Sequence, residues 1–106
     1  MKNNARFWLK MGLDYEKHGA YQQAIDSYAH IIALAPERFD GYLNLAHAYM
    51  GLEDYEQAIE SCNLGLRYAK EHKSEPWAKK LTKELEACKI KVSQEYTQSE
   101  YGTFCS

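Results

Sequence analysis

The side chains best suited to chemistry in this sequence are its three cysteines and four histidines. Cys62, Cys88 and Cys105 are irregularly spaced without a CxxC pair, and their odd number does not predict a disulfide framework. Histidines that bind zinc from one helix stand four residues apart, and no two histidines have that spacing on an expected helix. The sequence therefore predicts no metal site. Cys62 and Cys88 are expected in the core, because free cysteine packs as a small hydrophobe.

No arrangement of residues typical of a catalytic site stands out. The sequence has no GxSxG turn, no conspicuous pair of carboxylates and no glycine-rich phosphate loop. Its six glycines are dispersed, so no backbone cradle for a phosphate is expected. We predict that the chain is not an enzyme and binds no cofactor.

Charge and composition restrict the partners. A net charge of −2 is too small to predict binding to nucleic acid or to an anionic membrane. The lysine-rich segment is expected to be a solvated helix face, because glutamates interleave with the lysines and no aromatic platform lies among them; it contains Lys79, Lys80, Lys83, Lys89 and Lys91. The sequence shows neither the apolar core of a signal peptide nor a run long enough to span a membrane. Together with the cysteine usage, this predicts a cytoplasmic location.

A pattern of aromatic and small apolar residues occurs twice along the chain. Tyr21 and Tyr55 are 34 residues apart, as are Ala24 and Ala58. Within each copy the apolar residues recur every three or four positions, so helices are expected over 4–17, 21–34, 39–51 and 55–70. Gly12, Ala24, Ala58 and Gly65 are expected where helices approach closely.

A fifth helix is expected from about residue 75 to 94. Pro76 suits its first turn, where the missing N–H costs nothing. One apolar stripe runs along it, made of Trp77, Leu81, Leu85, Cys88 and Val92. A helix with one apolar side can cap a stack of helical hairpins. Residues 95–106 carry no helical stripe and are expected to form a flexible tail.

The two copies resemble tetratricopeptide (TPR) repeats, which have a period of 34 residues. The first copy reads Trp8, Met11, Gly12, Tyr15, Gly19, Tyr21, Ala24, Tyr28, Leu34 and Pro36, and the second reads Tyr42, Leu45, Ala46, Tyr49, Tyr55, Ala58 and Cys62. The resemblance implies an all-α solenoid fragment over residues 1–94. Repeat 1 would cover about 5–38, repeat 2 about 39–72, and the capping helix about 75–94.

In TPR proteins the first helix of each repeat lines a concave groove that binds other proteins. The resemblance places six residues in that groove: Leu9, Lys10, Leu13, Leu43, Asn44 and His47. Leucines outside the core stripes tend to mark contacts, and these are expected to contribute little to the core. One TPR subfamily clamps a chaperone's C-terminal carboxylate, but only Asn44 matches that clamp. Leu9 and Leu13 cannot bind a carboxylate, so an apolar peptide is expected instead.

The predicted function is therefore non-catalytic binding of a peptide or helix of a partner protein. Two alternatives remain open. In the first, the chain self-assembles into a homo-oligomer, because two repeats are fewer than TPR arrays usually need and no predicted element covers the edge at Trp8. Alternatively, it resembles the small cytoplasmic TPR chaperones of bacterial secretion systems.

Overall fold

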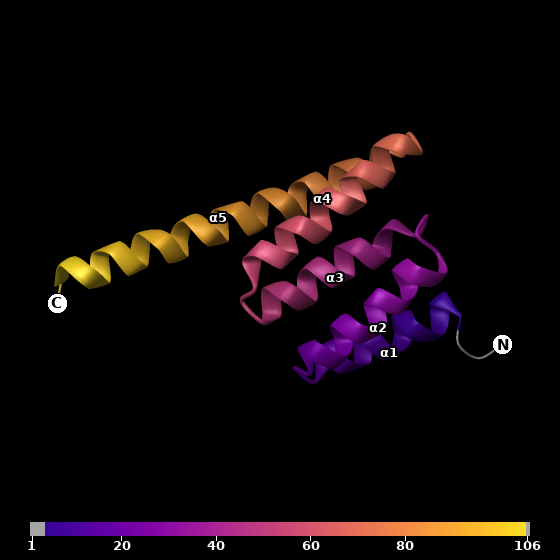
Figure 1. The fold of residues 1–106 in the computed structure, drawn as a ribbon, viewed down its shortest axis with the longest axis horizontal. Helices are drawn as coiled ribbons and strands as arrows, with labels where there is room; N and C mark the ends of the chain where they lie inside the picture. The colour runs from indigo at the N-terminus through magenta and orange to yellow at the C-terminus, as the bar shows by residue number, and fades with distance from the viewer. Residues whose placement is uncertain (1–3, 106) are drawn as a thin grey trace.

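The computed structural model describes residues 4–105, with side chains through residue 94. It contains five helices in sequence: α1 (Ala5–Lys17), α2 (Tyr21–Leu34), α3 (Phe39–Gly51), α4 (Tyr55–Glu71) and α5 (Glu75–Cys105). Each helix packs against the next one in the chain, and α3 also contacts α5. Figure 1 shows the result as a layered stack, with α1 and α2 at one end and α5 at the other. The predicted all-α class and the first four helices are confirmed.

Local signals in the sequence explain where the helices begin and end. The Asn4 side chain accepts a hydrogen bond from the Phe7 N–H at 2.9 Å and so caps the start of α1. Asp54 accepts from the Gln57 N–H at 3.3 Å and does the same for α4. The turn after α1 places Gly19 at a φ of 75°, the left-handed conformation that glycine adopts without steric cost.

The core is built where small residues let helices approach. A Cβ added to Gly12 would lie 2.3 Å from Cε1 of Tyr28, so only glycine fits against that ring. A Cβ on Gly65 would lie 2.8 Å from Cβ of Tyr42. Ala24 and Ala58 are completely buried. The predicted close contacts are therefore confirmed at the junctions of α1 with α2 and of α3 with α4.

The fifth helix is longer than the sequence predicted. Its end was expected near residue 94, but α5 continues to Cys105, and residues 95–105 contain no proline that would stop it. The expected flexibility of this segment stays a prediction. Leu81, Leu85 and Cys88 are buried as expected, whereas Val92 is 39% exposed. The buried stripe of α5 therefore ends at Cys88 among the side chains that are described, one step earlier than predicted.

Candidate partner-binding surface

The six predicted contact residues lie on α1 and α3, but their surroundings divide them into three pairs. Leu9 and Leu43 are half-buried and pack against core clusters. Lys10 and Leu13 are exposed on α1. Asn44 and His47 are half-buried on α3. The six residues therefore differ in burial and in the side chains that they contact.

Leu9 and Leu43 correct the expectation that the groove leucines contribute little to the core. Leu9 packs against the cluster that joins α1, α2 and α3, which includes Tyr28 and Ala48. Leu43 packs against the cluster formed by Phe39, Tyr42, Ala69 and Leu81. The apolar stripe of a packed helix is more than about 100° wide, so a residue next to the central stripe still contacts the neighbouring helices.

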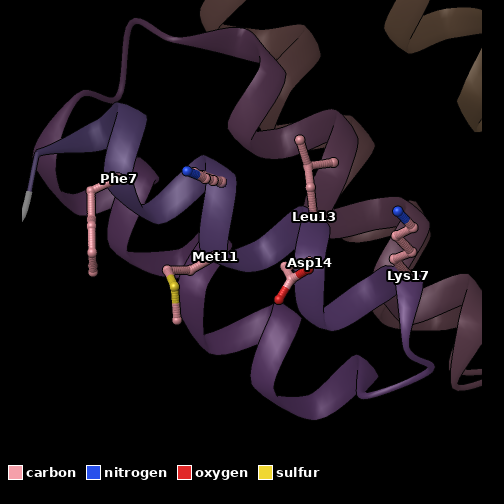
Figure 2. Close-up of a pocket in the computed structure, with 6 residues that line it drawn as sticks. Phe7, Met11, Leu13, Asp14 and Lys17 are labelled. Carbon is pink, nitrogen blue, oxygen red and sulfur yellow. The ribbon is translucent and has the colours of Figure 1, made fainter.

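Lys10 and Leu13 line an open depression of about 530 Å³ on α1. We call this surface the α1 face, and it consists of Phe7, Lys10, Met11, Leu13, Asp14 and Lys17. Its apolar side chains are accessible, since Leu13 is 48% and Phe7 37% exposed. In Figure 2 the labelled side chains all project from this one helix, with Phe7 at one end and Lys17 at the other. Four of the six residues were not among the predicted contacts.

Trp8 is not part of this open face. Its ring stacks on the ring of His30 from α2, with centroids 4.0 Å apart and an angle of 15° between the planes. Phe7, Met11 and Asp14, rather than Trp8, line the depression on α1. That surface could have been found from the repeat, because these residues precede Gly41, Leu45 and Ala48 by 34 positions.

His47 joins α3 to α5. Its Nε2 atom lies 2.9 Å from Oε1 of Glu84, and the carboxylate accepts the hydrogen bond when Nε2 carries the proton. The His47 side chain remains 41% exposed and that of Glu84 20%. Glu84 is one of the glutamates that interleave with the lysines of α5, and the sequence did not indicate its contact because it joins residues 37 positions apart.

The cysteines are placed as core residues. Cys62 and Cys88 lie in one buried cluster with Ala46, Ala58 and Leu85. Burial, followed by the nearby Cys88 and Glu84, raises the pKa of the Cys62 thiol to about 12. Burial also raises the pKa of Cys88. A nucleophilic thiolate is therefore disfavoured at both positions at neutral pH. The side chain of Cys105 lies outside the described residues.

The part of the chain with described side chains contains no group of three or more His, Cys, Asp or Glu residues that could hold a metal ion. Among the described residues, no helix is both long enough and apolar enough to cross a membrane.

Stacked helical hairpins with a repeat of 34 residues and an accessible face on the first helix define a helical-repeat protein. Within that class, the sequence matches the family model of the tetratricopeptide repeat over residues 16–81. The chain belongs to the tetratricopeptide repeat family. TPR domains are generally protein–protein interaction modules and typically carry no catalytic activity, so protein partners are implied in general.

Proposed function

We propose that this TPR domain is a non-catalytic adaptor that binds a peptide or helix of a partner protein along α1 and α3. The observation that carries the proposal is Leu13, an apolar side chain 48% exposed on α1, which would be the first helix of repeat 1. A solvent-exposed leucine beside a depression offers an anchor point for an apolar side chain of a partner. The adaptor role also assumes the cytoplasmic location inferred from the sequence.

The proposed contact residues are Lys10 and Leu13 on α1, with Asn44 and His47 on α3. Leu9 and Leu43 would hold the helices that carry these residues in place, since both leucines pack into the core. The Asn44 amide offers donors and an acceptor to the backbone of an extended or helical segment. The bond from His47 to Glu84 would fix the imidazole orientation before a partner arrives.

The proposal can be tested by site-specific photocrosslinking. A photoreactive phenylalanine analogue is placed at Asn44, or at Asn63 as the control, which is exposed on α4. After irradiation in cells, the Asn44 position should yield a discrete crosslinked partner that mass spectrometry identifies, and Leu13→Glu should remove it. Crosslinks from Asn63 but not from Asn44 would instead assign partner binding to α4 and refute the proposed surface.

A further inference from the structure

The α1 face occupies a position that a helix covers in the other repeat. Its residues Phe7, Met11 and Asp14 correspond, 34 positions on, to Gly41, Leu45 and Ala48 of α3. There, a Cβ on Gly41 would lie 3.1 Å from Ile31 of α2, while Leu45 and Ala48 belong to the cluster formed with α2. The repeat therefore indicates that the α1 face has the position of a helix-binding surface.

The residues of the α1 face are larger and more charged than their counterparts on α3. These differences restrict which kind of helix can bind there. Gly41 and Ala48 admit α2 at close range, whereas the larger Phe7 and Asp14 would hold a helix further away and place a carboxylate beneath it. The Asp14 side chain is 69% exposed, and its Oδ1 is 3.9 Å from Nδ1 of His18, which is too long for a hydrogen bond. A helix covering Asp14 must supply a cation, and one near Lys10 and Lys17 must supply an anion.

A second copy of α1 meets both requirements. Lys10 and Asp14 each lie two positions from Gly12, on opposite sides along the helix. If two α1 helices pack antiparallel about a two-fold axis level with Gly12, Lys10 of each copy stands level with Asp14 of the partner subunit. Phe7, Met11 and Leu13 would then close the contact around these reciprocal pairs. In a two-fold interface each contact occurs twice, so one complementary pair gives two.

We propose that the α1 face is a homodimer interface in which two copies pack through antiparallel α1 helices and pair Lys10 with Asp14 reciprocally. Asn44 and His47 of the adaptor surface lie outside the α1 face. Lys10 and Leu13 are shared, so a dimer would restrict the access of a partner to α1 but leave α3 open.

Charge reversal tests the pairing, with sedimentation equilibrium as the readout. Lys10→Glu alone and Asp14→Lys alone each create two like-charge contacts, and each should weaken the dimer about tenfold or more. Equimolar mixing of the two variants restores both pairs in a heterodimer, and the double variant restores them in a homodimer. Both should regain the wild-type dissociation constant. The mixture is decisive, because a change within one subunit cannot be repaired by a second variant.

Two matched variants define the surface. Leu13→Glu should abolish the dimer, while Leu64→Glu, at a leucine 40% exposed on α4, should leave it intact. Circular dichroism checks that each variant remains folded. A wild-type chain that stays monomeric up to about millimolar concentration, the range of the weakest specific complexes, overturns the proposal. So does a dimer that both single reversals leave unchanged, or one that mixing fails to restore. The adaptor surface is judged separately by comparing the Asn44 and Asn63 crosslinks in the Asp14→Lys variant, because Asp14 belongs to the α1 face and not to the adaptor surface.

Discussion

At the scale of single residues, two leucines predicted to be alike differ in what surrounds them. Leu43 packs against the cluster of Phe39, Tyr42, Ala69 and Leu81, whereas Leu13 is 48% exposed. Leu43→Glu should lower the free energy of unfolding by about 1–3 kcal/mol, since it puts a charge beside buried apolar side chains. Leu13→Glu should change it by no more than about 0.5 kcal/mol. Urea denaturation of both variants measures the difference, and equal losses would contradict these placements.

The buried thiol and phenol groups predict how stability depends on pH. Burial raises the pKa of Cys62 from 9.0 to about 12, and burial with the nearby Tyr68 and Glu37 raises the pKa of Tyr42 to about 12. Between the unfolded and folded pKa values, the unfolded chain loses protons that the folded chain keeps. Stability is therefore fully present below about pH 9 and falls as the pH rises toward 12.

Thermal unfolding from pH 8 to 11 should accordingly show a falling melting temperature. Cys62→Ala removes one of the groups responsible, so its melting temperature should start lower because of the cavity but fall less steeply with pH. The informative quantity is the slope, and Cys62→Ala with the wild-type slope would show that this thiol does not contribute.

At the scale of elements, α5 is predicted to be necessary for the stack. It buries Leu81, Leu85 and Cys88 against α3 and α4. Each fully buried side chain of leucine size stabilises the fold by about 1.5–3 kcal/mol. A chain ending at Glu71 should therefore aggregate or lose helicity, which circular dichroism and light scattering detect. The control chain ending at Gln94 keeps the buried stripe and should melt close to the full-length temperature.

The turns between helices predict a stabilising substitution. Gly19 takes a left-handed φ after α1, and Lys73 takes the same conformation after α4 with a φ of 54°. A non-glycine residue there costs about 1–2 kcal/mol of backbone energy, partly offset by the greater unfolded freedom of glycine. Lys73→Gly should raise stability by about 0.5–1 kcal/mol. Lys70→Gly, inside α4, should instead lower it by about 1 kcal/mol. A fall in stability for both would contradict the turn geometry.

The sequence predicts the elements well because their signals are local. Asn4 and Gly19 mark the two ends of α1. Ala24 and Ala58 mark the positions where helices cross, and the residue type alone indicates each of them. The end of α5 could not be placed in the same way. No proline interrupts residues 95–105, so the missing apolar stripe was wrongly taken as a missing helix. An apolar stripe indicates that a helix packs against a neighbouring helix. A helix can continue beyond the end of such a stripe.

At the scale of the whole molecule, the candidate surface was only partly predictable. The resemblance pointed to α1 and α3 as the groove helices, and two of its predicted groove residues, Lys10 and Leu13, line the α1 face. It did not reveal that Leu9 and Leu43 enter the core or that His47 reaches Glu84. Those contacts depend on how far each helix is rotated about its axis relative to its neighbours. The sequence of one helix does not determine that rotation.

The shape of the molecule gives the last prediction. The chain measures 57 × 32 × 16 Å and has a radius of gyration of 15.3 Å, whereas a compact domain of this length would have about 13 Å. α1 and α5 lie at opposite ends of the stack in Figure 1, so a dimer formed through α1 places the two α5 helices far apart. X-ray scattering should show a radius of gyration near 15.3 Å when the protein is dilute and a clearly larger, elongated particle as the dimer forms. Leu13→Glu, which puts a charge in place of an apolar side chain of the α1 face, should hold the small value at every concentration. A dimer that persists in this variant would mean that the copies associate through a different surface, because contact at the α5 end would also lengthen the stack.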